Sequence, residues 1–213
     1  MSRLIVALDC EAEKAIEIAE KISDYVYAFK VNYPLVLKSG LSLIKTLSKI
    51  SMVIADFKIA DVPHMSSQIA ECAFEAGAKA VIAHAFVGFD SLEAVVNKSK
   101  KYGGEVYAVC ELSSEGGKEF MLPVSEKLAK VAVKAGCSGI VAPATRVERI
   151  KSLRKVVGNL KIISPGVGVQ GGSALEAIKA GADYVIVGRR VIVGDVVKNV
   201  EEILKEIGDI DED

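Results

Sequence analysis

The segment KAGADYVIV (residues 179–187) runs from the end of a helical pattern through a glycine into an apolar run. Similar segments occur at EAGAKAVI (residues 75–82) and KAGCSGIV (residues 134–141). Glycine readily adopts the left-handed conformation that closes a helix, so Gly77, Gly136 and Gly181 are each expected to end one. These segments indicate weak internal repetition of a helix–glycine–strand joint.

Short apolar runs alternate with helical patterns along the whole chain of 213 residues. Each run is near-continuously apolar, which is typical of a parallel strand buried on both faces. The stretches between them carry apolar residues at three- and four-residue spacing, as amphipathic helices do. The expected strands are residues 4–8, 27–31, 52–57, 80–84, 106–110, 139–142, 161–164 and 184–187, and the clearest helices are 11–22, 66–76, 91–102, 124–135 and 146–157.

This alternation requires a parallel sheet with helical crossovers. Eight strand–helix units are the number at which a (β/α)8 barrel, or TIM barrel, closes. An open doubly wound sheet is the alternative, but no GxGxxG motif follows the first strand, where a dinucleotide-binding fold carries one. The sequence predicts a single barrel domain over residues 1–213, with a frayed acidic tail at residues 209–213.

The composition narrows the class of protein further. The chain is 51% hydrophobic and 26% charged with a net charge of −1, which excludes disorder and argues against a nucleic-acid partner. No apolar run reaches the ~18–20 residues of a membrane span, and the start is too short for a signal peptide. We therefore expect a cytoplasmic protein without a membrane partner. Its scattered cysteines suggest buried thiols in a reducing compartment: Cys10, Cys72, Cys110 and Cys137.

Polar residues gather where the predicted strands end, which is where the chemistry of a barrel is found. Taken singly, three of them have ordinary structural interpretations: Asp9 as a helix cap, Lys30 as a cation extended to water, and His84 as a hydrogen-bonded rim residue. The residues at or after the strand ends are Asp9, Lys30, Asp56, Lys58, His84, Ser113, Pro165, Gly166, Gly188 and Arg189.

The motif DFKIAD (residues 56–61) is harder to explain structurally. Residues 56 and 58 are two apart on a strand, so their side chains are expected to leave the same face. An ion pair would account for Asp56 and Lys58, but not for Asp61, Lys30 and Asp9 at the same rim. Alternating fixed charges in a cleft can stabilise a charged transition state, so this cluster is predicted to be catalytic.

A second signal follows the last two strands. SPGVGVQGG (residues 164–172) comes after strand seven, and Arg189 comes after strand eight. In many barrels these two loops bind phosphate, because glycine lets backbone amides approach and arginine adds a cation. The glycines alone would be explained by turns, but Arg189 favours a phosphorylated small-molecule ligand.

With both clusters described, the chain resembles the orotidine 5′-monophosphate decarboxylase family of the compact microbial type. The similarity extends nearly end to end, through LIVALD (4–9), FKVNYP (29–34), DFKIAD (56–61), SPGVGVQGG (164–172) and VGRR (187–190). This resemblance implies a carboxy-lyase of pyrimidine biosynthesis that converts orotidine monophosphate (OMP) into uridine monophosphate (UMP) and carbon dioxide. It also implies a homodimer that uses no cofactor and no metal.

The resemblance assigns a role to each matching residue. Lys30, Asp56, Lys58 and Asp61 would form the catalytic charge network, with Asp61 reaching into the neighbouring subunit's site and Lys58 donating the proton. The loop at residues 167–172 is expected to be mobile without ligand and ordered with it. Substrate would be held by Asp9 at the ribose, by Ser113 at the pyrimidine, by Gln170, Gly188 and Arg189 at the phosphate, and by Pro165.

One position departs from the family, and two alternatives stay open. The family commonly has a threonine where this chain has Met65; Ser66 could replace its ribose contact, or the contact is absent. A metal-dependent hexulose-phosphate synthase shares the Asp-x-Lys-x-x-Asp strand, but its family has a metal-binding glutamate where Lys30 stands, and a cation there would repel the ion. A non-catalytic barrel that binds a nucleotide or sugar phosphate is the other alternative.

Overall fold

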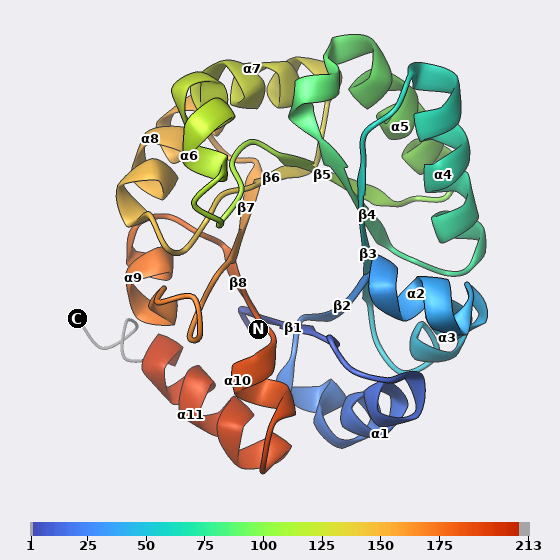
Figure 1. Ribbon diagram of the computed structural model, residues 1–213, viewed down its shortest axis with the longest axis vertical. Coiled ribbons are helices and arrows are strands. Elements are labelled where there is room, and N and C mark those ends of the chain that lie inside the picture. The colour runs from blue at the N-terminus through green and yellow to red at the C-terminus, as the bar shows by residue number, and fades with distance from the viewer. Residues whose placement is uncertain (1, 209–213) are drawn as a thin grey trace.

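The computed structural model describes residues 2–208, which form a closed barrel of eight parallel strands in chain order (Figure 1). Strand β1 pairs with both β2 and β8, which closes the sheet and confirms the predicted (β/α)8 barrel. The predicted acidic tail lies outside the described residues. The strands are β1 (Leu4–Ala7), β2 (Ala28–Asn32), β3 (Val53–Ile59), β4 (Ala80–His84), β5 (Glu105–Val109), β6 (Gly139–Val141), β7 (Lys161–Pro165) and β8 (Tyr184–Val187).

The helices form a ring outside the strands (Figure 1). Helix α4 begins at Pro63 rather than Ser66, because proline fits the first turn of a helix, where its missing N–H costs nothing. Short helices that the sequence did not predict occur inside the loops. The helices are α1 (Ala12–Ile22), α2 (Tyr33–Ser39), α3 (Ser42–Leu47), α4 (Pro63–Glu75), α5 (Phe89–Lys101), α6 (Gly117–Phe120), α7 (Ser125–Ala135), α8 (Val147–Val157), α9 (Ala174–Lys179), α10 (Arg189–Ile192) and α11 (Val196–Gly208), with 3-10 turns η1 (Ser23–Tyr25), η2 (Ala85–Val87) and η3 (Leu122–Val124). Within residues 2–208, no helix has the length and apolar character needed to cross a membrane.

The core lies between the strands and the inner faces of the helices. Every residue of β1 is buried, as near-continuous apolar strands predict. Helix α1 buries the face that its three- and four-residue spacing predicted, including Ile18 and Ile22. Gly77, Gly136 and Gly181 all have positive φ, so the repeated helix–glycine–strand joint is also confirmed.

Side chains close the N-terminal end of the barrel. Tyr107 is fully buried and donates a hydrogen bond to Glu105 Oε2 at 2.6 Å. Lys161, at the start of β7, pairs with the other Glu105 oxygen at 2.6 Å. These paired groups lie at the end of the barrel opposite to the strands' C-termini.

The prediction that the cysteines belong to the core is wrong for part of the set. Cys110 and Cys137 are buried, but Cys10 is half-buried and Cys72 is exposed. Cys10 lies at the rim, three residues after the end of β1, and Cys72 lies on the solvent-exposed face of α4. Burial raises the pKa of the Cys110 thiol and raises that of Cys137 to about 12, so both are unreactive thiols.

The close approach of two strands at Gly139 gives a stability prediction. A Cβ at this position would lie 2.3 Å from the Lys161 carbonyl oxygen and 2.8 Å from the Tyr107 ring. Gly139→Ala should therefore lower the free energy of unfolding by roughly 1–3 kcal/mol, as overpacking does. Urea denaturation measures this, with Gly116→Ala as the matched control, because nothing lies within 4 Å of a Cβ there. Equal midpoints for the two variants would contradict the packing described here.

Candidate active site

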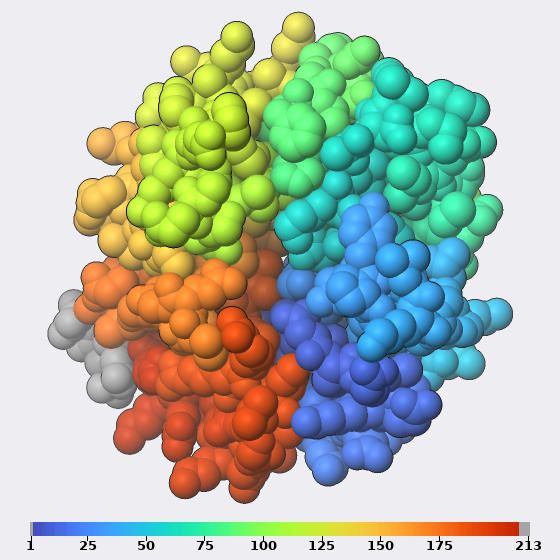
Figure 2. Space-filling model, in the orientation of Figure 1, coloured from blue at the N-terminus to red at the C-terminus, as the bar shows by residue number. Residues whose placement is uncertain are grey.

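A cavity of about 240 Å³ occupies the C-terminal mouth of the barrel. Figure 2 shows the hollow at the centre of this face, between the segments at the start and the end of the chain. Every predicted site residue except Asp61 lines it: Asp9, Lys30, Asp56, Lys58, Ser113, Pro165, Gln170, Gly188 and Arg189. Residues from distant parts of the sequence therefore share one cleft, as the barrel topology requires.

The centre of the cavity is an ion triad formed by Lys30, Asp56 and Lys58. Lys30 Nζ lies 2.9 Å from Asp56 Oδ2, and Lys58 Nζ lies 2.8 Å from Asp56 Oδ1. Lys30 and Asp56 are only 7% and 6% exposed, whereas the Lys58 side chain is 41% exposed toward the cavity. Lys30 is thus not extended to water, and Lys58 is the cation that a ligand can reach.

The two lysines decide the ionisation of Asp56. Burial by itself would raise the pKa of this carboxyl, because an apolar environment disfavours the charged form. The charges and hydrogen bonds of Lys30 and Lys58 outweigh that effect and hold the pKa below its usual range. A permanent negative charge therefore stands in the cavity, fixed between two cations.

The strand that carries the triad is not regular. Its pairing with β4 shifts register between Ala55 and Ile59, and Lys58 has φ of 41°. Lys58 is the one non-glycine residue within residues 2–208 that has positive φ, which costs of order 1–3 kcal/mol. Asp56 and Lys58 do meet, but through a bulge and not through the simple alternation that the sequence predicted. Such strain is typical of functional sites, where packing over-determines the backbone.

Asp9 belongs to the cavity and not to a helix end. The residue that precedes α1 is Glu11, so Asp9 is not its cap. Its Oδ1 instead accepts a hydrogen bond from Asn32 Nδ2 at 2.6 Å, while Asn32 Oδ1 caps α2 by accepting from the Leu35 amide. Sequence reasoning missed Asn32, although an asparagine just before Tyr-Pro is a recognisable helix start.

Asp61 lies outside the cavity of its own chain, contrary to the prediction that it shares the rim with Asp9 and Lys30. Strand β3 ends at Ile59, and the chain then turns outward, leaving Asp61 exposed with Oδ1 bonded to the Val62 amide at 2.7 Å. Ser66 is fully buried and donates its hydroxyl hydrogen to the Asp61 carbonyl at 2.7 Å. The neighbouring side chain that reaches the surface is Met65, which is 41% exposed.

The opposite wall of the cavity has free donors. Gly166, Gly168 and Gly171 all have positive φ, so the loop after β7 makes turns that other residues rarely accept. Gln170 is exposed and lines the cavity, as does Arg189 at the start of α10. Arg189 forms no ion pair with any described residue, so its guanidinium can take an anion there.

Glu111 is the main cavity residue that sequence reasoning missed. It lies two residues after β5 and is fully buried, and both carboxylate oxygens pair with arginines: Arg146 Nε at 2.5 Å and Arg149 Nε at 3.2 Å. Arg146 also donates to the Leu112 carbonyl. This cluster fixes the backbone just before Ser113. The sequence feature that could have identified Glu111 is an acidic residue just after a predicted strand, two residues before Ser113.

His84 is also not the hydrogen-bonded rim residue that was expected. It is buried, its ring lies 4.6 Å from that of Phe86, and its Nδ1 has no hydrogen-bond partner among residues 2–208. Burial, together with the nearby Lys58 charge, lowers the pKa of His84 to about 4. The imidazole is therefore neutral at pH 7 and adds no charge to the site.

Fold and cavity together define a (β/α)8-barrel protein with a charge-paired site for a small anionic ligand. The model of the orotidine 5'-phosphate decarboxylase / HUMPS family matches residues 2–203. The chain belongs to this family.

Curated relatives and solved structures agree with this assignment. Orotidine 5'-phosphate decarboxylase of Methanococcoides burtonii is 54% identical over 91% of both chains, and that of Thermococcus kodakarensis is 49% identical over 89% of both. The orotidine 5'-monophosphate decarboxylase of Methanocaldococcus jannaschii, complexed with the inhibitor BMP, superposes with a TM-score of 0.92 at 38% identity, covering 97% of this chain and 99% of that one.

The depressed pKa of His84 predicts a pH dependence of stability. As pH falls from about 6.5 to about 4, the unfolded chain binds a proton that the buried imidazole does not, so the free energy of unfolding decreases. His84→Gln removes this pH dependence. The difference in free energy of unfolding between wild type and His84→Gln should therefore change by roughly 2–3 kcal/mol between these two pH values. Urea denaturation at several pH values measures it, with His64→Gln, at an exposed histidine, as control. Parallel pH profiles for wild type and His84→Gln would refute a buried neutral imidazole.

Proposed function

We propose that the protein is an orotidine 5′-monophosphate decarboxylase, which converts OMP into UMP and carbon dioxide. The observation that carries the proposal is the ion triad, a buried carboxylate paired with one buried cation and one cation open to the cavity. The names of the relatives, at 54% and 50% identity over most of the chain, support a decarboxylase and not the aldolase alternative.

In the proposed reaction, the substrate carboxylate enters beside Asp56. Two negative charges close together disfavour the bound ground state and favour loss of neutral carbon dioxide. The bond to the carboxyl carbon breaks, and its electron pair stays on the ring carbon. Lys58 stabilises that carbanion and then gives its proton to the carbon, so the neutral amine regains a proton from solvent. Lys30 keeps Asp56 charged and in place.

The rest of the cavity would hold the substrate. Asp9, oriented by Asn32, would accept from a ribose hydroxyl, and Ser113 and Pro165 would contact the pyrimidine. Gln170, the Gly188 backbone and Arg189 would bind the phosphate. Closure of the loop at residues 167–172 over the phosphate would convert remote binding energy into organisation at the ring.

We further propose that catalysis uses no cofactor and no metal. Both oxygens of Asp56 are engaged by ammonium groups, and Lys30 would repel a divalent ion. The cytoplasm is the expected location, because the family is biosynthetic and the cysteines are free thiols.

We also propose a homodimer with shared sites, and the position of Asp61 supports it. This residue is exposed outside its own cavity, beside exposed apolar residues at the ends of the neighbouring strands β2, β3 and β4. Burying such apolar surface against a second copy would favour association and bring Asp61 to the partner's cavity. These apolar residues are Tyr33, Leu37, Val62, Met65 and Phe86.

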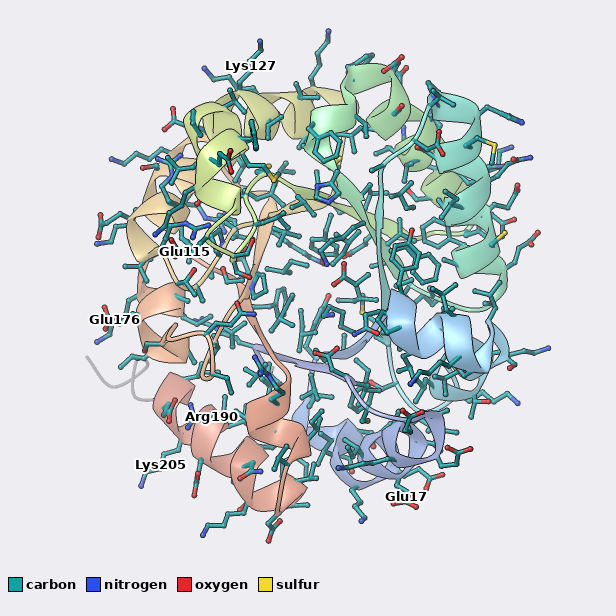
Figure 3. The ribbon with its side chains drawn as sticks, viewed as in Figure 1. Glu17, Glu115, Lys127, Glu176, Arg190 and Lys205 are labelled. Atoms are coloured by element: carbon teal, nitrogen blue, oxygen red, sulfur yellow. The ribbon has the colours of Figure 1, made fainter. Side chains whose placement is uncertain are left out.

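Removal of the Lys58 ammonium tests the chemistry. Lys58→Ala should lower kcat for OMP at least about 10³-fold, because it loses both a charge contact and the proton donor. UMP should still bind. The measurement is loss of OMP absorbance in buffer with excess chelator, where the wild type should keep full activity. Lys127→Ala is the control, since Lys127 lies on α7 and points away from the barrel mouth (Figure 3). Full turnover by Lys58→Ala, or inactivation of the wild type by chelator, would overturn the respective proposal.

Mixing two inactive variants tests the shared site. Asp61→Ala and Lys58→Ala should each be nearly inactive. In an equal mixture that is allowed to exchange subunits, about half of the dimers are mixed and each mixed dimer has one intact site of two, so the mixture should regain about one quarter of wild-type activity. Sedimentation measures whether the protein has the expected mass of a dimer. A mixture as inactive as its components would show that Asp61 does not act across an interface.

A further inference from the structure

The second arginine of VGRR has no part in the proposed reaction. Arg189 lines the cavity, whereas Arg190 is directed toward α11 and pairs with Glu206 there. Its Nη1 donates to Glu206 Oε2 at 3.0 Å, and its Nη2 donates to Oε1. Figure 3 shows Arg190 between the loop that follows β7 and helix α11. A two-bond contact of this kind fixes the orientation of the guanidinium as well as its position.

The aliphatic part of Arg190 lies against the glycine loop. A Cβ built at Gly168 would be 3.2 Å from Arg190 Cδ and 3.3 Å from its Cβ, so the loop backbone rests directly on this side chain. Gly168 is also the centre of a tight turn, because its amide donates to the Gly172 carbonyl at 2.9 Å and its carbonyl accepts from Gly171 at 2.7 Å. Arg190 therefore supports the turn by direct contact with Gly168.

The same turn carries a ligand-facing side chain. Gln170 lies between Gly168 and Gly172 and lines the cavity. The two ends of the loop are fixed by Val167, which is buried, and by the Gly172 amide, which donates to the Gly166 carbonyl at 3.0 Å. Between these ends Val169 is 62% exposed and nothing lies within 4 Å of a Cβ at Gly171, so the tip of the turn packs through the contact of Gly168 with Arg190.

We propose that Arg190, held by Glu206, is a positioning residue that keeps the phosphate-binding loop at the position in which it contacts the ligand's phosphate. The inference rests on the proposed function, since it concerns the phosphate of the same nucleotide. Helix α11 thereby supports a loop that belongs to a different βα unit. An error of about 1 Å in such a contact can cost as much as 10²-fold in activity, which is why a support without ligand contact matters.

The experiment compares ligands with and without phosphate. Kd values for UMP and uridine are measured by calorimetry, and their ratio reports the contribution of the phosphate alone. Arg190→Ala should reduce the preference for UMP over uridine by roughly tenfold or more and leave uridine binding unchanged. Lys98→Met is the matched control, because it breaks another partly buried ion pair, between Lys98 of α5 and Glu71 of α4, neither of which lines the cavity, and it should change neither Kd.

A second variant keeps the proposal testable if Arg190→Ala fails to fold. Glu206→Ala keeps a good helix former at a partly exposed position of α11 and removes only the anchor of Arg190, so it should lower the same ratio by a smaller factor, about threefold. An unchanged ratio in both variants, or equal weakening of UMP and uridine binding, would overturn the positioning role of Arg190. The proposed function would still stand in that case if the wild type turned over OMP. A wild type that bound UMP no better than uridine would overturn both.

Discussion

The structure of the site depends on one carboxylate shared between two ammonium groups. Asp56 is almost completely buried, and an isolated carboxylate there would take up a proton rather than remain charged. Lys30 and Lys58 reverse that preference and keep the charge. Because only Lys58 is open to the cavity, the arrangement separates a cation that secures the acid from a cation that can act on a ligand. The field is in place before a substrate arrives, so little reorganisation is needed during the reaction.

The barrel makes this arrangement possible by bringing adjacent strand ends together. Parallel pairing sets Lys30 of β2 next to β3, and the bulge in β3 then turns the Lys58 ammonium back onto Asp56. The strained backbone at Lys58 is tolerated because well-packed strands on both sides hold it. The opposite wall is built differently, from glycine turns supported by Arg190 and from Arg189, so one side of the mouth provides charge for chemistry and the other provides amides and a cation for an anion.

Much of this could be predicted from the sequence. The spacing of apolar residues and the glycine joints indicated the barrel. Sequence patterns also identified almost all of the charged and polar residues that line the cavity, because parallel strands bring their ends to one rim. The bulge at Lys58 could not be predicted, since alternation along a strand assumes regular pairing. Asn32 and Glu111 carry local signals, a helix cap and an acid after a strand, but their contacts in the site, with Asp9 and with Arg146, join distant parts of the chain and could not be predicted. The position of Asp61 depends on how the backbone leaves β3, and the burial of His84 and Ser66 depends on packing that local sequence does not encode.

The most direct test of the account is a pH titration of the Asp56 side chain by carbon NMR of the carboxyl group, in the wild type and in Lys30→Met. We predict that wild-type Asp56 remains ionised to a pH below the ordinary range of an aspartate, and that its pKa rises when Lys30 is replaced, because burial is then opposed by one cation instead of two. An Asp56 that titrates at or above the ordinary aspartate pKa in the wild type, or that is indifferent to Lys30, would contradict the central claim that two lysines hold a permanent negative charge in the cavity.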